Sequence, residues 1–244
     1  AYQLTKKESY CKAIIETLQF VERELMDADG GFYSALDADS EGVEGKFYTW
    51  SAAEITQLLK NDAPLFMAYY GVTETGNWEH TNILHTPNAA CAVAQSLGIT
   101  ESELLSTIQN CNTVLMVERN KRVRPQTDDK QLLGWNALMN TAFSKAYAAT
   151  GNKDYLIRAQ KNMAHLFECF KDANGDGWLH TYKNSQAKTP AFLDDYAYLI
   201  EALIQLQMVS GDFQWLEKAG EITDYVNDHF MILIRTCKCL WLSF

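Results

Sequence analysis

Two pairs of neighbouring aspartates are the side chains of this sequence best suited to acid–base chemistry. Asp194 and Asp195 lie at the start of one apolar stretch, and Asp128 and Asp129 precede another. Carboxylates near a helix N-terminus are also stabilised by the helix dipole and by capping, which gives these residues a purely structural alternative. Two carboxylates brought together could act as general acid and base on a glycosidic bond. We predict Asp195 and Asp129 as the first catalytic candidates, and Asp194 and Asp128 as the second.

Aromatic and polar residues on the extended segments supply a candidate binding surface. Sugar rings stack on aromatic faces, and binding sites combine such faces with a few polar groups. The predicted substrate-binding residues are Trp50, Trp78, Trp135, Trp178, Tyr196, His80, His180, Asp37 and Asp39. The alternative is that the rings hold the extended segments against neighbouring helices.

Other chemistries find less support in the sequence. An epimerase-type proton shuttle needs two histidines, and neither of the two apolar helical stretches contains one. Residues 172–177 and 37–42 begin like calcium-binding loops, but Lys183 and Tyr48 stand where such a loop needs glutamate. No phosphate-binding loop is present. We therefore predict no metal and no cofactor.

Two kinds of helix must position these residues. Residues 6–26 and 154–170 are apolar on one face and polar on the other, with Asn162 among the polar positions, which is typical of surface helices. Residues 132–149, and those from Thr189 onward, are apolar nearly all round, which predicts burial on every side. Thr189 and the following proline are interpreted as the N-cap and first residue of that last helix.

Shorter signals mark the remaining elements. Ser51 and Glu54 form a capping-box pattern, and residues 100–118 have a helical pattern. Residues 178–182 alternate and predict one arm of a hairpin. The order of surface helix, aromatic extended segment and buried helix occurs twice, which indicates an internal repeat. Such an alternation builds either two concentric rings of helices, an α/α toroid, or a solenoid of stacked helix pairs.

Length and composition exclude several classes of protein. The 244 residues allow one large domain or two small ones. A formal net charge of -10 argues against binding to nucleic acid or to an anionic membrane surface. No apolar run reaches the roughly 20 residues that span a bilayer. The six cysteines are scattered, which favours buried free thiols in a reducing compartment and predicts a cytoplasmic protein.

Six longer motifs carry a family resemblance. They are Gly30–Trp50, Asn82–His85, Arg124–Pro125, Asp128–Lys130, Trp135–Asn136 and Pro190–Tyr196. In these motifs the chain resembles the spermatogenesis-associated, thioredoxin-domain-containing family (bacterial YyaL-type proteins). The resemblance implies an all-α fold, an α/α toroid similar to six-hairpin glycosidases and N-acylglucosamine 2-epimerases, with short β-hairpins at one rim. It brings no established activity.

Three departures from that family qualify the prediction. The thioredoxin-like domain is absent from the sequence, and Gln126 stands where the family tends to have histidine. Residues 231–244 do not match the family, so we predict an incomplete toroid over residues 1–230 and an atypical tail after it. An incomplete ring predicts a hydrophobic edge open to self-association.

Two functions follow from these observations. The first is a carbohydrate-processing domain, glycosidase- or sugar-epimerase-like, that acts on a small sugar through carboxylates at the rim. The alternative is a non-catalytic binding or scaffold domain of a thioredoxin-linked protein. Carboxylates about 5–5.5 or 6.5–9.5 Å apart in an open pocket favour hydrolysis. Carboxylates engaged by arginine or by backbone N–H groups favour the scaffold.

Overall fold

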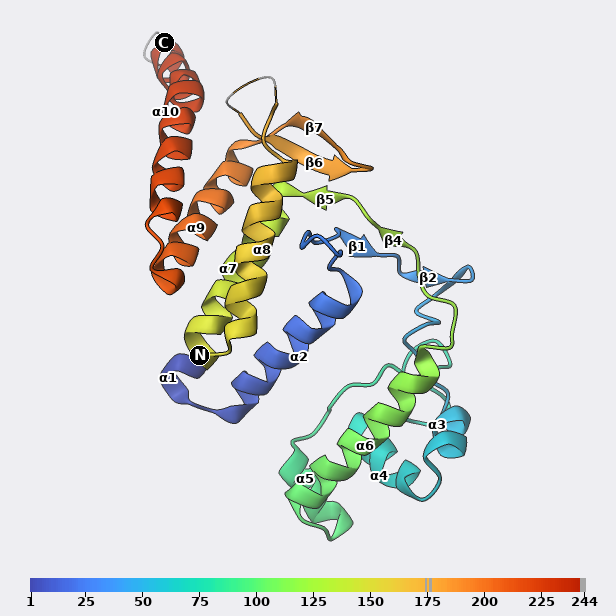
Figure 1. Ribbon diagram of the computed structural model, residues 1–244. Coiled ribbons are helices and arrows are strands. Elements are labelled where there is room, and N and C mark those ends of the chain that lie inside the picture. Colours follow the sequence, from blue (N-terminus) through green and yellow to red (C-terminus); the bar gives the residue numbers. More distant parts are fainter. Residues whose placement is uncertain (174, 176, 242–244) are drawn as a thin grey trace. The chain divides into compact units, whose positions relative to one another are not determined.

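A computed structural model describes residues 1–173, 175 and 177–241, with side chains described as far as residue 230 (Figure 1). The chain forms two compact units. Unit 1 comprises Ala1–Ala35 and Thr127–Phe244, and unit 2 comprises Leu36–Gln126. Unit 2 is therefore one continuous stretch inserted into the sequence of unit 1. The side chains of the predicted tail lie outside the described residues, and its boundary at residue 230 stays a prediction.

Unit 1 is built mainly from helices. They are α1 (Tyr2–Thr5), α2 (Glu8–Glu24), α7 (Leu133–Thr150), α8 (Lys153–Cys169), α9 (Leu193–Ser210) and α10 (Gln214–Trp241). Short turns that begin at Gly151 and Gly211, both in the left-handed conformation, join α7 to α8 and α9 to α10. Such short connections make consecutive helices antiparallel neighbours. In Figure 1, α7 lies beside both α8 and α9, and α10 lies beside α9.

These helix pairs are the repeating unit that an α/α fold requires. The amphipathic α2 and α8 correspond to the two predicted surface helices, and α7 and α9 to the two predicted apolar ones. The all-α class with short β-hairpins is therefore confirmed. The completeness of a ring stays a prediction.

A three-stranded antiparallel sheet lies beside the ends of these helices. Its strands are β5 (Gln131–Leu132), β6 (Leu179–Lys183) and β7 (Gln186–Pro190), in the order β5-β6-β7. Asn184 and Ser185 form the two-residue turn between β6 and β7 with φ of 52° and 56°, as the hairpin's twist requires. The strand predicted over residues 178–182 is thus confirmed with a shift of one residue.

The predicted start of α9 was wrong. Thr189 and Pro190 end β7, where Pro190 pairs with Leu179, and the N–H of Ala191 then donates to the carbonyl of Trp178. This pairing keeps the chain extended up to the N-cap Phe192, so the helix begins at Leu193. The turn that Thr189 was expected to cap is therefore part of the hairpin.

The composition of α7 and α9 predicted that both helices are buried on every side. That prediction was wrong for both. Trp135 and Leu138 are exposed on α7, and Leu193, Ile204 and Met208 are exposed on α9. Each helix packs over part of its circumference and leaves an apolar stripe uncovered in the described residues. Self-association through such a surface stays a prediction.

A ladder of three buried asparagines joins α7, α8 and the loop after α2. Asn136, Asn140 and Asn162 have fully buried side chains. Asn140 Nδ2 donates to Asn162 Oδ1 at 3.1 Å, and Asn162 Nδ2 donates to Asn136 Oδ1 at 3.2 Å. Asn162 was predicted on the polar, solvent-facing side of its helix. That prediction was wrong, because its amide faces the interior and also donates to the carbonyl of Gly30.

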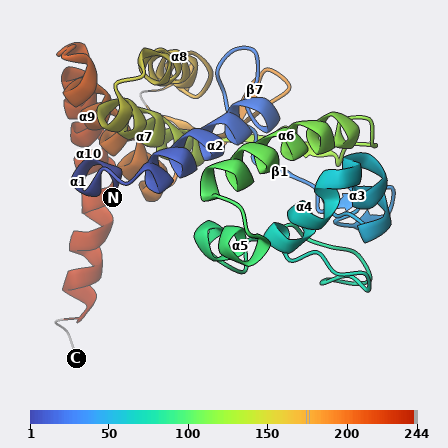
Figure 2. The ribbon, with the colours of Figure 1, turned by 90° about the horizontal axis from the view of Figure 1, so that it is seen from below.

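Unit 2 consists of shorter elements. They are β2 (Asp39–Ser40), β3 (Val43–Glu44), α3 (Ala52–Leu59), the 3₁₀ helix η1 (Lys60–Asp62), α4 (Ala63–Tyr70), α5 (Ala90–Leu97) and α6 (Glu101–Arg119). Strands β1 (Ala35–Leu36) and β4 (Thr127–Asp128) lie where the chain passes between the units. Figure 2 shows α3, α4, α5 and α6 gathered together, and their apolar faces share one core around Ile55, Phe66 and Leu104. Among the helices that the structure describes, none combines the length and apolar character needed to cross a bilayer.

The predicted capping box at the start of α3 is confirmed and gives a stability prediction. Ser51 Oγ accepts the N–H of Glu54 at 3.1 Å, and Glu54 Oε2 accepts the N–H of Ser51 at 2.9 Å. We expect Ser51→Ala to lower the free energy of opening of α3 by about 1 kcal/mol, because a helix N–H loses its acceptor. Hydrogen exchange of the α3 amides measures this. The exposed Ser106→Ala in α6 should leave α3 unchanged, and equal protection in both variants would contradict the capping role.

Candidate active site

A histidine–aspartate pair lies where β6 approaches the N-terminal ends of α7 and α9. His180 Nδ1 lies 2.7 Å from Asp195 Oδ2. Because a carboxylate only accepts hydrogen bonds, the neutral imidazole carries its proton on Nδ1 and presents the lone pair of Nε2. The His180 side chain is 25% exposed, whereas the Asp195 side chain is 3% exposed. The pair therefore offers one partly exposed base held by a buried carboxylate.

The sequence places the two partners through the sheet and the first turn of α9. β5 pairs with β6, so that Leu132 lies opposite Thr181, the neighbour of His180. Because α7 begins directly after β5, this pairing brings its N-terminus beside β6. Asp195 occupies the third position of α9, from which its Oδ2 also accepts the N–H of Phe192 at 2.9 Å. The carboxylate is thus a capping group of its own helix as well as the partner of His180.

A backbone N–H from α7 completes the surroundings of Asp195. Gly134 donates to Asp195 Oδ1 at 3.0 Å. A Cβ atom at Gly134 would lie 2.8 Å from that oxygen and 3.2 Å from Tyr198 Cδ2, so the close approach requires glycine. Asp195 therefore accepts three hydrogen bonds, two from backbone N–H groups and one from imidazole. This arrangement suits a positioning group better than a proton donor to substrate, and the predicted catalytic role of Asp195 stays a prediction.

Tyr196 contacts the residue that precedes the β6–β7 hairpin. Its hydroxyl accepts the N–H of Trp178 at 3.0 Å, and its ring stacks on Tyr225 with centroids 5.5 Å apart. Burial raises the pKa of Tyr196 to about 12, so the hydroxyl stays protonated at neutral pH. Tyr196 is buried and its contacts hold the hairpin, while its contact with substrate stays a prediction.

The other predicted catalytic carboxylates have exposed side chains. Among the described residues, no hydrogen bond or ion pair joins any of them to Asp195. Asp129 Oδ1 lies 2.5 Å from Lys183 Nζ, and Asp128 Oδ2 lies 3.4 Å from Lys130 Nζ. The N–H of Lys130 donates to Asp128 and holds the pKa of that carboxyl below its usual range. Asp194 lies exposed on the first turn of α9. Each of these two carboxylates is solvated and paired with a lysine, which does not favour a general acid.

The four predicted tryptophans divide by exposure. Trp135 is 55% exposed on the first turn of α7, immediately after Gly134. Trp50 and Trp178 are 3% and 4% exposed, so little of either ring is open to a ligand, and their stacking on substrate stays a prediction. Arg122 lies 3.9 Å from the ring centroid of Trp50, and Phe167 packs edge-on against Trp178. These two rings pack between extended segments and their neighbours. This packing is the structural alternative given above, in which the rings hold the extended segments against helices.

Several of the predicted substrate-binding residues belong to unit 2, whereas His180 and Asp195 belong to unit 1. Asp37 and Asp39 are exposed, and Asp37 Oδ1 accepts the N–H of Asp39 at 3.2 Å, as in an Asx turn. Trp78 is half-buried, and His80 is exposed with a φ of 65°. Their predicted substrate-binding roles stay predictions. The acidic loop at residues 172–177 includes positions 174 and 176, which lie outside the described residues.

Some residues near His180 were missed by the sequence analysis. The ring of Phe192 packs against the His180 imidazole, with centroids 4.8 Å apart, and its side chain is 53% exposed. Gly134 was missed as well, because an unremarkable helical glycine gives no sign of its contact with Asp195. Phe192 could have been identified as a site residue because it lies in the motif Pro190–Tyr196, which also contains Asp194 and Asp195.

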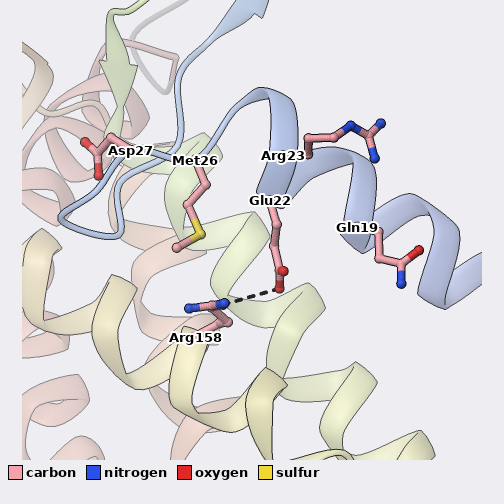
Figure 3. Close-up of a pocket in the computed structure, with 6 residues that line it drawn as sticks. All are labelled: Gln19, Glu22, Arg23, Met26, Asp27 and Arg158. Atoms are coloured by element: carbon pink, nitrogen blue, oxygen red, sulfur yellow. Dashed lines mark ion pairs between the residues drawn. The ribbon is translucent and has the colours of Figure 1, made fainter. Parts of the chain in front are cut away.

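Open hollows lie elsewhere in the two units. One in unit 1, of about 460 Å³, lies between α2 and α8 (Figure 3). In Figure 3, Glu22 of α2 points toward Arg158 of α8, and Glu22 Oε1 lies 3.4 Å from Arg158 Nε. Asp27 also lines this hollow. A smaller one, of about 220 Å³, is bordered by Trp178 and Lys218. No residue of the His180–Asp195 pair lines either hollow.

Fold and site together define a protein of paired α-helices with a histidine–aspartate pair at the helix N-termini. The chain is homologous to spermatogenesis-associated protein 20, and the predicted family resemblance is confirmed. It is 29% identical to the human protein over 264 residues, which cover 92% of this chain and 33% of that protein. An uncharacterised protein of Caenorhabditis elegans is 31% identical over 250 residues, 89% of this chain and 34% of that one. The chain thus spans about a third of the length of these relatives.

Other comparisons add less. No protein-family model matches the chain. The cellobiose 2-epimerase of Bacillus thermoamylovorans superposes with a TM-score of 0.38 at 13% identity, covering 89% of this chain and 55% of that one. An α-mannanase of Bacteroides thetaiotaomicron superposes with a TM-score of 0.36 at 14% identity, covering 93% and 55%. We assign no residue role from these superpositions.

Proposed function

We propose that this chain is a carbohydrate-processing domain in which His180 transfers a proton to and from a small sugar. The observation that carries the proposal is the His180–Asp195 contact of 2.7 Å, with a buried carboxylate behind a partly exposed imidazole. An imidazole oriented in this way keeps one ring nitrogen free for general acid–base catalysis. The reaction class that fits a single base is proton removal beside a sugar carbonyl.

Two exposed rings, one against the imidazole and one beside Gly134, support a sugar as substrate. Phe192 packs on His180, and Trp135 follows the glycine whose N–H contacts Asp195. Both rings are more than half exposed. Apolar ring faces next to a few polar groups are the usual composition of small-molecule sites. Hydrolysis by a carboxylate pair receives less support, since Asp129 is held by Lys183 and Asp195 by N–H donors.

Deuterium uptake from solvent tests this function. Purified chain is incubated in D₂O with a panel of mono- and disaccharides, and exchange at the carbon beside the carbonyl is followed by NMR. We expect exchange with one class of sugar, and His180→Asn should lower its rate by about 10²–10⁴-fold, because the base is removed. The exposed His85→Asn is the matched control and should leave the rate unchanged. If no sugar exchanges, or if His180→Asn exchanges at the full rate, the proposal fails.

A scaffold domain is the second candidate, and one observation favours it. The Asp195 carboxylate accepts three hydrogen bonds, as a purely structural capping group would. Thermal unfolding with the same sugar panel separates the two candidates, because a ligand that binds only the folded state raises the midpoint. A cooperative transition that no sugar shifts, together with no deuterium exchange, favours the scaffold.

A further inference from the structure

Unit 1 holds a second polar cluster, which uses none of the residues of the His180–Asp195 pair. Cys169 Sγ lies 3.7 Å from His165 Nδ1, one turn earlier on α8. His165 Nε2 lies 2.7 Å from Gln131 Oε1 on β5. The Gln131 amide in turn donates to the Asp27 carboxylate, which also accepts three backbone N–H groups. His165 is buried, whereas Cys169 is partly exposed.

The chain of contacts fixes where the protons lie. The Asp27 carboxylate accepts only, so the amide nitrogen of Gln131 faces Asp27 and its oxygen faces His165. That oxygen requires a proton on His165 Nε2. In the neutral imidazole, Nδ1 then carries the lone pair and accepts from the Cys169 thiol. The imidazole is therefore oriented as a base toward a sulfur that solvent can reach.

Burial keeps both partners uncharged at neutral pH. It lowers the pKa of His165, although the nearby Asp27, Asp29 and Glu168 oppose the shift and Lys161 adds to it. It also raises the pKa of the Cys169 thiol, although the Tyr182 hydroxyl, which hydrogen-bonds the sulfur, opposes that shift. The thiol thus keeps its proton and the imidazole its lone pair over the same pH range. Near neutral pH, the Cys169 sulfur therefore needs His165 to accept its proton before it can react.

We propose that Cys169 is a thiol–disulfide exchange site, in which His165 accepts the thiol proton while the sulfur attacks a low-molecular-weight disulfide. The Cys169 sulfur forms a bond to one sulfur of the disulfide, and the disulfide bond breaks. The departing thiolate takes the proton from the His165 imidazolium. One thiol and one disulfide give one mixed disulfide and one new thiol, so that electrons and protons balance. The negative side chains nearby favour an uncharged disulfide over an anionic one.

The pH dependence of modification tests the proposal within one sample. The folded chain is treated with bis(2-hydroxyethyl) disulfide, which is uncharged, and mixed disulfides at Cys169 and at the exposed Cys91 are quantified by mass spectrometry. A thiol without a base reacts through its thiolate, so its rate rises about tenfold per pH unit below its pKa. We expect that rise at Cys91. At Cys169 we expect a change of less than about threefold between roughly pH 7 and 8, because the base already carries the lone pair.

A variant identifies the base. In His165→Asn the rate at Cys169 should fall about tenfold or more at neutral pH and regain the tenfold rise per pH unit, while Cys91 stays unchanged. A circular dichroism melt checks folding. If this variant does not fold, the comparison of the two cysteines in the unchanged chain still decides. A tenfold rise per pH unit at Cys169 in the unchanged chain, or no modification there while Cys91 reacts, overturns the proposal.

Discussion

Asn136→Leu is expected to lower the free energy of unfolding of unit 1 by about 3–5 kcal/mol. Asn136 makes all four hydrogen bonds that its amide allows. Its Oδ1 accepts from the N–H of Phe32 at 2.7 Å and from Asn162, and its Nδ2 donates to the carbonyls of Phe32 at 3.0 Å and of Leu132 at 2.9 Å. Leucine has a similar volume but no polar atoms, so it strands several buried groups, each costing about 1–3 kcal/mol.

Chemical denaturation measures this loss, with Asn110→Leu as the control. Asn110 is exposed on α6, and the same substitution there should change stability by no more than about 0.5 kcal/mol. Equal losses in the two variants would show that the ladder contributes nothing specific. A loss in Asn136→Leu that Asn162→Leu does not enlarge when the two are combined would indicate that both act through the same network.

The second large effect is expected at Asp195. Asp195→Asn should lower the free energy of unfolding by about 2–4 kcal/mol, because one amide oxygen replaces two carboxylate oxygens that accept three hydrogen bonds. The new NH₂ group must then face an N–H donor of Gly134 or Phe192, or the His180 ring. Urea unfolding followed by circular dichroism measures the change.

Asp194→Asn is the matched control for that experiment, since the neighbouring carboxylate is exposed on the same turn. It should change stability by no more than about 0.5 kcal/mol. If Asp195→Asn and Asp194→Asn have the same stability, the three hydrogen bonds of Asp195 do not hold the start of α9. The positioning role that the proposed function assigns to this carboxylate would then lose its basis.

Local patterns in the sequence were sufficient to predict some of the helices, whereas α10 was not predicted. Amphipathic spacing identified α2 and α8, the capping box at Ser51 identified the start of α3, and the helical pattern over residues 100–118 identified α6. The start of α9 was missed because Thr189 and Pro190 carry a local capping signal that pairing with β6 overrides. Such pairing is a contact between strands, which no local pattern encodes.

The candidate site was predictable only in part, for a related reason. The motif Asp194–Asp195 drew attention to the correct turn, but the contact that distinguishes the two carboxylates comes from Gly134, about sixty residues earlier in the chain. Asn162 was assigned to the polar face because asparagine is usually exposed, whereas here its amide lies in the core and hydrogen-bonds Asn136, Asn140 and the carbonyl of Gly30. Trp50 and Trp178 were expected at a surface, but large rings also fill the gaps beneath loops.

The insertion of unit 2 into unit 1 has a consequence for synthesis on the ribosome. The contacts of unit 1 include one from Gly30 to Asn162 and one from Phe32 to Asn136, so residues before unit 2 wait for partners that are translated after it. Unit 2 is contiguous and leaves the exit tunnel with all its core residues together. Because domains form as units in the order of translation, unit 2 is the part that acquires structure first. Until α7 and α8 emerge, the apolar face of the amphipathic α2 lacks the helices that it packs against in unit 1.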